Sequence, residues 1–489
     1  MSQNGERRLM MKRTIKKALS LLMAMLMVLN VYIPTGALAK TFSAQTQTKA
    51  RGAYRPVYSV SIAFDSGKKI IKADEKVYLF AKMTKVVSEW ETKGAYWLQQ
   101  FVSDGSKDII TYPIDFKNQN QSSEDWIQYG GDEVSFELRK ATESSLSWTD
   151  AYQNTQGKYS SIDVGDTVAN YKVSSIEMKL SEAGSEESPV DKYIIEVDLS
   201  EIIPQKEYNY KSVLGQGLYY GITADKLIQK NDLQTNFAVN QYKRTGSDGI
   251  TPDLSGQSSG VVVAGEFIDG STMKLNAPDK GVVAIYTSSS EKSNFVDLKD
   301  NVSIVHEEKD IIRTAVVDPI LNHGASVSSK MASKDATFVP SITPGNYFTI
   351  DTTMFEDGVT IYIDADAFAN KLNITDGLSL KKRDNQVVVF NFKKTKNVNI
   401  AQYKVFYNNE WINTVTDTGQ SARNTKVERA CRNVVWNIVT QDAQVNLYTA
   451  SGIILVPNGN VELGGGDANN GSGACAGWVI CGGTVTTNV

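Results

Sequence analysis

Three short apolar runs near the end of the chain constrain its fold more than any other feature. They span residues 433–438, 452–461 and 477–485, and Gly, Pro or Asn residues mark the turns that close them. The second and third runs are similar to each other. Repetition at roughly 20–30 residues is typical of a stacked β-coil, in which one turn of chain buries its apolar face only against the next turn. The pattern predicts that residues 453–456 and 478–481 lie one above the other.

The first residues have the features of an export signal. Six basic residues precede an apolar run at 18–31, and Ala37-Leu38-Ala39 supplies the small residues that a signal peptidase requires before Lys40. The alternative is an uncleaved membrane anchor, but the run is shorter than the roughly 20 residues that span a bilayer. The sequence therefore predicts a signal peptide at 1–39, a polar flexible leader at 40–55 and no transmembrane span in the mature chain.

The charge balance argues against nucleic acid as a partner. Without residues 1–39 the chain keeps 45 Lys and Arg against 54 Asp and Glu, and no cluster of basic residues follows Lys17. Affinity for phosphate comes chiefly from clustered Lys and Arg. We therefore expect a secreted, acidic protein whose partner is a protein or a glycan.

The region 56–204 is predicted to be an immunoglobulin-like β-sandwich. Apolar side chains alternate with polar ones at 58–64, and further strands are expected at 76–83, 95–101 and 108–116. Two alternating runs at 176–180 and 193–199 form a predicted hairpin. Several short antiparallel strands with almost no helical periodicity are typical of a sandwich.

One convincing helix is expected between residues 308 and 334. Asp318 followed by Pro319 has the pattern of an N-cap with proline at the first helical position. Four small or apolar residues then recur at helical spacing on one face: Ile320, Gly324, Val327 and Met331. This stripe predicts that the helix lies against the β-coil. Shorter elements are a helical segment at 224–230, a turn or two at 364–371, and strands at 347–350, 359–363 and 387–392.

Two groups of residues resemble a known family. Residues 214–222 (LGQGLYYGI) precede residues 234–239 (QTNFAV), and the strands VVWN, ILVPNGNV and GWVICGGTV close the chain in that order. Both groups are similar to the choice-of-anchor A family of bacterial surface proteins, which are described as adhesins carried outside the cell. The resemblance covers about 210–489 and implies a helix-braced β-coil, adhesion, and a place at the cell surface or cell wall.

The residues that could carry catalysis or bind metal have simpler structural explanations. His306 lacks the second histidine that a zinc protease helix places four residues later, and His323 lies in the expected helix. The pair Asp364 and Asp366 could serve a glycosidase, but nothing selects it above other acidic pairs, and a solvated strand edge is the simpler interpretation. The loop with Asp467, Asn469 and Gly471 lacks the terminal glutamate of a calcium loop. The sequence assigns no catalytic, cofactor-binding or metal-binding residue.

Aromatic side chains are the remaining candidates for ligand contact. Trp90, Trp97, Trp126 and Trp148 lie in the N-terminal region, where exposed rings could stack on sugars or anchor a protein partner, although Trp97 could equally be core. Trp436 and Trp478 are expected in the repeat strands, as core or stacked residues. The ligand-binding residues are otherwise unidentified.

The three cysteines, Cys431, Cys475 and Cys481, are too few for a disulfide framework, and their spacing fits no four-ligand zinc site. Small buried hydrophobic residues are one interpretation. One disulfide, either Cys475–Cys481 or a pair with Cys431, is the other.

The combined expectation is a mainly β protein: an immunoglobulin-like β-sandwich at 56–204 and, at 205–489, a right-handed β-helix-like adhesive domain braced by a long helix. The predicted function is non-catalytic attachment to a host or matrix surface. The alternatives are a polysaccharide-binding or polysaccharide-cleaving β-helix protein and a structural stalk. A flat, neutral Thr/Asn-lined face favours the adhesin, and Thr484, Thr486, Thr487 and Asn488 point that way.

The last residues, 486–489, are strand-like and carry no polar cap. An open end of a β-coil exposes apolar surface and unpaired strand edges. The sequence therefore predicts that the domain at 205–489 is truncated at its C-terminal end and continues past Val489 into a cap and an anchor.

Overall fold

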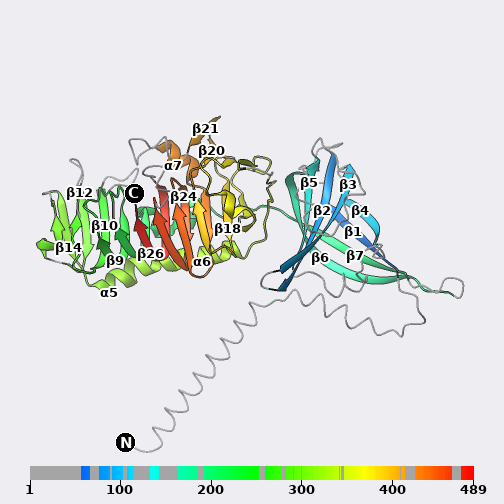
Figure 1. Cartoon of the computed structure of the whole chain (residues 1–489), viewed down its shortest axis with the longest axis horizontal. Helices are drawn as coiled ribbons and strands as arrows, with labels where there is room; N and C mark the ends of the chain where they lie inside the picture. Colours follow the sequence, from blue (N-terminus) through cyan, green and yellow to red (C-terminus); the bar gives the residue numbers. More distant parts are fainter. Residues whose placement is uncertain are drawn as a thin grey trace, which may run out of the picture.

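The protein is mainly β in the computed structural model (Figure 1). The structure describes residues 57–65, 76–88, 91–102, 107–114, 133–141, 164–185, 192–252, 259–276, 282–289, 291–298, 300–340, 342, 346–407, 409–413, 425–464 and 475–488. The expected signal peptide at 1–39 and leader at 40–55 lie outside these residues. Among the described residues, no helix has both the length and the apolar character needed to cross a bilayer.

The N-terminal strands form one seven-stranded sheet in the order β3-β2-β5-β6-β7-β1-β4. Its neighbours are antiparallel except β1 and β7, which are parallel. The strands are β1 (Val57–Asp65), β2 (Lys76–Ser88), β3 (Glu91–Val102), β4 (Lys107–Ile114), β5 (Glu133–Ala141), β6 (Val164–Glu182) and β7 (Lys192–Ile202). The expected strands and the expected hairpin are confirmed, with Ile176 of β6 opposite Val197 of β7. The immunoglobulin-like sandwich stays a prediction, because most side chains of these strands lie outside the described residues.

The C-terminal body, the described residues from Gln205 onward, contains ten parallel strands side by side in one sheet. Their order is β14-β12-β10-β9-β8-β26-β24-β22-β18-β16. The strands are β8 (Ile222–Gln229), β9 (Phe237–Arg244), β10 (Ser259–Phe267), β12 (Val282–Thr287), β14 (Val302–His306), β16 (Thr360–Asp364), β18 (Val387–Phe392), β22 (Val434–Ile438), β24 (Ser451–Val456) and β26 (Ala476–Thr487). The chain first builds the sheet outward from β8 to β14. It then resumes at the far edge with β16 and returns to the middle.

The strand β26 therefore lies in the centre of this sheet, between β24 and β8 (Figure 1). Ile453 pairs with Trp478 and Val456 with Cys481, which confirms the predicted stacking of residues 453–456 on 478–481. On its other side Val479 pairs with Ile222 of β8. The expectation that the last rung is open was wrong, because β26 has a strand neighbour on each side.

Shorter strands form the other sides of the body. β19 (Asn397–Ile400), β23 (Ala443–Leu447) and β25 (Gly459–Leu463) pair in parallel, and β25 then pairs with the second half of β26. A four-stranded sheet contains β15 (Phe348–Asp351), β17 (Leu378–Lys381), β20 (Lys404–Tyr407) and β21 (Glu410–Asn413). The pair β11 (Met273–Lys274) and β13 (Phe295–Val296) completes the set. From β22 to β26 the chain thus alternates between two parallel layers around one apolar core.

A continuous helical segment packs on the outer side of the ten-stranded sheet (Figure 1). It comprises α5 (Lys309–Ile312), the π-helical turn η5 (Arg313–Val317) and α6 (Asp318–Ala332). Ile320, Val327 and Met331 are buried against residues that include Val389, Val435 and Ile480, so the predicted apolar stripe is confirmed. The predicted N-cap at Asp318 was wrong. The helical path begins about two and a half turns earlier, after Glu308, and Asp318 is itself helical.

A buried polar clamp fixes α6 to the sheet. The side-chain amide of Asn437 donates to the Ser328 carbonyl at 3.0 Å and to Oδ1 of Asn391 at 2.7 Å, and its Oδ1 accepts from Ser328 Oγ. Asn391 in turn donates to the Met331 carbonyl at 3.1 Å. Because each buried amide is satisfied, the clamp fixes the position of the helix along the strands.

The remaining helices are short: α4 (Tyr210–Leu214), η3 (Gly215–Tyr219), η4 (Lys292–Asn294), η6 (Asp366–Lys371) and α7 (Thr425–Cys431). The turn expected at 364–371 is confirmed by η6, and the strands expected at 347–350, 359–363 and 387–392 are confirmed by β15, β16 and β18. The prediction of a helical segment at 224–230 was wrong. It belongs to β8, where Ala224 and Leu227 are buried between the neighbouring strands β9 and β26, so tertiary packing overrides a helix-compatible local sequence.

Candidate functional site

One side of the C-terminal body is a flat surface of amide and hydroxyl side chains, which we call the polar face. Its residues stand on β19, β23, β25, β26 and β8: Asn397, Asn399, Gln444, Asn446, Asn460, Glu462, Thr484, Thr486 and Lys226. They alternate along each strand with buried residues such as Val398, Val445 and Val461. Because the strands are parallel and in register, side chains of adjacent strands line up in rows, and neighbours within a row are about 4.8 Å apart.

The rows of the polar face are ordered by their own hydrogen bonds. The amide of Asn446 donates to Oδ1 of Asn399 at 2.8 Å, and Oδ1 of Asn460 accepts from the backbone N–H of Thr484 at 2.9 Å. Glu462 and Lys226 contribute opposite charges, so the face as defined has no net charge. Thr484 and Thr486 belong to this face, as the sequence suggested. Thr487 does not, because its buried hydroxyl accepts from the Lys230 N–H at 3.0 Å.

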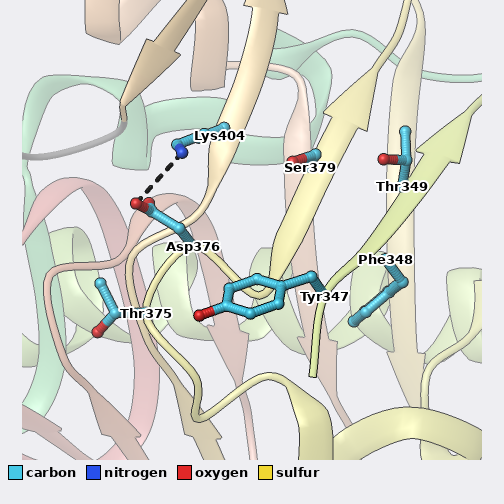
Figure 2. Close-up of a pocket in the computed structure, with 7 residues that line it drawn as sticks. All are labelled: Tyr347, Phe348, Thr349, Thr375, Asp376, Ser379 and Lys404. Atoms are coloured by element: carbon cyan, nitrogen blue, oxygen red, sulfur yellow. Dashed lines mark ion pairs between the residues drawn. The ribbon is translucent and has the colours of Figure 1, made fainter. Parts of the chain in front are cut away.

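A second candidate is a groove on the outer side of the four-stranded sheet (Figure 2). It has a volume of about 620 Å³, and its lining residues are Tyr347, Phe348, Thr349, Thr375, Asp376, Ser379 and Lys404. The Tyr347 ring lies along the groove with its hydroxyl toward Thr375, while Asp376 and Lys404 face each other above it (Figure 2). The next row of the same outer face carries Phe406 and Trp411, which are cross-strand partners with ring centroids 5.2 Å apart.

Asp376 is held in a defined orientation at this groove. Its backbone adopts the left-handed conformation at φ 58°, and its N–H donates to the Gln402 carbonyl at 2.8 Å. The Gln402 side chain donates to Oδ1 at 3.0 Å, while Lys404 Nζ lies 3.3 Å from Oδ2. Residues outside glycine that hold this conformation are uncommon and cluster at binding sites. The sequence analysis missed this groove, because its strands have only four residues each and its aromatic residues are far apart in the chain.

The acidic pair Asp364 and Asp366 lies together at the end of β16, but Asp366 is committed to structure. Its carboxylate accepts from the backbone N–H groups of Lys393, Lys394 and Thr395 and from the Thr395 hydroxyl, at 2.7–2.9 Å. Restricted hydration and then the Asp366 carboxylate raise the pKa of Asp364, which accepts the Asp366 N–H at 3.1 Å. The pair therefore closes a turn, and the Asp366 carboxylate is already occupied by its backbone donors.

The two histidines lie apart. His306 is exposed at the end of β14, and His323 lies 3.1 Å from the Ser212 carbonyl, which ties α6 to α4. Across the part of the chain that the structure describes, no three His, Cys, Asp or Glu side chains are grouped to hold a metal ion. The loop with Asp467, Asn469 and Gly471 lies outside that part.

All three cysteines are free thiols. Cys431 and Cys481 are buried, and burial raises the pKa of each thiol to about 12. Cys475 is half-buried and donates to the Leu447 carbonyl at 3.3 Å. Of the two interpretations, small buried residues hold for Cys431 and Cys481.

The tryptophans singled out from the sequence lie either in the core or, wholly or partly, outside the described residues. Trp436 is fully buried, stacks on Phe390 at 4.4 Å and donates to the Ser451 carbonyl at 3.0 Å. Trp478 packs under η3, where its indole donates to the Leu218 carbonyl at 3.3 Å. Both are core, as expected. Trp90, Trp126 and Trp148, and the side chain of Trp97, lie outside the described residues.

Comparison of the chain with family models, with curated proteins and with solved structures gives no match. The two segments that carry the resemblance noted above are neighbours in space, since Gly221 and Ile222 of the first contact Val479 of the second. Function is therefore argued from the two surfaces themselves.

Proposed function

We propose that this protein is an exported, non-catalytic cell-surface adhesin, related to the choice-of-anchor A proteins, whose C-terminal body is a right-handed β-helix braced by the helical segment. The polar face is the observation that carries this proposal. It presents repeated, uncharged amide and hydroxyl groups on a rigid support, and the same repeat offers many similar weak contacts instead of one deep cavity.

The order of the face supports a binding role. The side chains stand on strands whose inner residues are fully buried, so they lose little conformational freedom when a ligand binds. Weak contacts gain strength when many copies are displayed on one surface, because the second contact is made at high effective concentration. Attachment of a cell requires this kind of strength.

Bead attachment tests the proposal. Beads coated with the full chain should adhere to immobilised matrix proteins or to cultured epithelial cells more strongly than albumin-coated beads, while the soluble protein binds weakly. The double variant Asn446→Lys, Thr486→Lys should reduce adhesion several-fold. Ser329→Lys, on the exposed side of α6, is the matched control and should leave adhesion unchanged.

Two results would contradict the adhesin proposal. One is adhesion no better than that of albumin-coated beads on every surface. The other is turnover of a glycan, peptide or ester that depends on one acidic residue, which would favour a polysaccharide-cleaving enzyme.

A further inference from the structure

Beside the groove of Figure 2, the next outward row carries the half-buried Phe406 and the exposed Trp411, and together they form a second surface on the four-stranded sheet. We call it the aromatic groove and define it by Tyr347, Asp376, Ser379, Lys404, Phe406 and Trp411. Tyr347 is 68% exposed and Trp411 is 46% exposed, although other aromatic residues of this sheet region, Phe348 and Tyr403, are buried. Several large aromatic side chains exposed to solvent at one place are typical of a binding surface.

The register places Phe406 and Trp411 on the outward side of the sheet, and Tyr347 lies on the same side because it lines the groove. Thr349, Ser379 and Lys404 form one outward row, and Lys381, Phe406 and Trp411 form the next. Tyr347 precedes Asp351, which belongs to the Trp411 row, by four residues, so it lies about 13 Å from Trp411 along the strands and about 14 Å across them. The rings therefore lie across an extended surface and not around a single point.

The charges of the surface cancel. Lys404 pairs with Asp376 at 3.3 Å, and Lys381 pairs with Asp351 at 3.3 Å. Lys381 also lies 5.7 Å from the centre of the Phe406 ring. A ligand with a net charge would meet no excess of opposite charge here, so charge complementarity favours a neutral ligand.

The polar groups suit a ligand that carries many hydroxyls. The carboxylate of Asp376 accepts hydrogen bonds, the ammonium of Lys404 donates them, and Ser379 and Thr349 do both. Gln402 and the left-handed backbone fix Asp376 before any ligand arrives, which lowers the entropy cost of binding. Hydroxyl groups on adjacent ring carbons both donate and accept, and they match such a set.

We propose that the aromatic groove binds a neutral polysaccharide, with sugar rings stacked on Tyr347 and Trp411 and their hydroxyls bonded to Asp376 and Lys404. A sugar ring has one apolar face of C–H groups and a rim of hydroxyls, and this surface offers aromatic faces beside paired donors and acceptors. An extended peptide offers one backbone N–H and one C=O per residue, whereas each sugar ring offers several hydroxyls that both donate and accept, which suits this set of polar groups better. This inference rests on the proposed adhesive function, for which it names a ligand class.

Affinity electrophoresis of the full chain tests the inference. The gels contain galactomannan, xyloglucan or hydroxyethyl cellulose as neutral probes and polygalacturonate as an acidic probe. At least one neutral polysaccharide should retard the protein, and Trp411→Ala and Tyr347→Ala should each weaken the apparent affinity about tenfold or more. Tyr347→Phe keeps the ring and should retain most of the affinity.

Two further variants separate binding from folding. Asp376→Asn tolerates the left-handed backbone and should weaken binding with an unchanged circular dichroism spectrum. Tyr219→Ala removes a ring that is 57% exposed on η3, outside the groove, and should have no effect.

The inference is overturned if the folded protein passes through all three neutral gels without retardation, if polygalacturonate retards it more than they do, or if it binds matrix proteins through Trp411 instead. If bead adhesion persists in Trp411→Ala but is lost in the Asn446→Lys, Thr486→Lys variant, the adhesin proposal is retained and the aromatic groove is not its ligand site.

Discussion

Val485 of β26 lies in register beside Leu227 of β8, and both side chains are fully buried. On its other side Val485 pairs with Val461 of β25. This seam joins the strands that precede the helical segment to those that follow it, so its integrity should decide whether the C-terminal body is one cooperative unit.

Lysine substitutions at adjacent positions of β26 should lower the free energy of unfolding strongly at an inward position and only weakly at an outward one. Val485→Lys places an unpaired charge in the core and should lower the free energy of unfolding by about 3 kcal/mol or more. Thr486→Lys, its outward neighbour opposite Glu462, should change it by less than about 0.5 kcal/mol. Urea unfolding followed by tryptophan fluorescence measures both, and equal effects would contradict the assigned register.

The buried clamp on α6 and the exposed ladder of the polar face offer a matched pair of asparagines. Asn437→Ala removes the hydrogen-bond partner of the Ser328 hydroxyl and of Asn391 Oδ1 and should cost about 2–4 kcal/mol. Asn446→Ala removes a similar amide bond at the surface and should cost less than about 1 kcal/mol. Similar unfolding midpoints for the two variants would count against the clamp.

Gly477 should tolerate no side chain. It has φ +123°, and a Cβ there would lie 2.0 Å from the carbonyl oxygen of its strand partner Gly452. Gly477→Ala should therefore destabilise by about 3 kcal/mol or more, or prevent folding. Gly270→Ala, with φ +65° and open space around it, should cost about 1 kcal/mol from backbone strain alone. Thermal unfolding compares the two, and a Gly477→Ala protein as stable as Gly270→Ala would refute the close approach.

Lys382 gives a pH dependence with a definite sign. Lys382 is 5% exposed, its ammonium donates to the carbonyls of Arg383, Asp384 and Gln386, and burial lowers its pKa to about 8. The unfolded chain, with a lysine pKa of about 10.4, binds more protons than the folded chain between these values, so the contribution of Lys382 to stability rises from pH 8 to pH 10.4.

The measurement is the difference in unfolding free energy between the wild type and Lys382→Met. This difference should grow by about 3 kcal/mol across that window. Lys330→Met, at an exposed position of α6, is the surface control for the substitution itself. A falling or constant difference for Lys382→Met would show that burial does not lower the pKa of this lysine in the folded protein.

The sequence predicted the elements whose signal is local. The strands at 387–392 and 453–456 were found because each is a continuous apolar run, and the stripe from Ile320 to Met331 was found because it has the helical period. Thr484 and Thr486 were placed on a Thr/Asn-lined face by residue type alone, together with Thr487, which is buried. These features need no knowledge of the rest of the chain.

What the sequence did not predict depends on distant partners. Nothing local in residues 222–229 indicates that β26 is a neighbour, and the helix-compatible Ala224 to Lys226 become a strand only because β9 and β26 enclose them. The aromatic groove escaped notice because Tyr347 and Trp411 meet through pairing of four short strands. The one available clue was that both motifs of the family resemblance flank this seam.

The central place of β26 also sets the order of events during folding. β8 cannot gain its second neighbour until the chain as far as β26 has been synthesised, and pairing across so long a loop is entropically slow. The ten-stranded sheet is therefore expected to close late, with the core between β8 and β24 exposed until then. For the export that we propose, this delay is useful, because the body cannot lock until β26 has been synthesised.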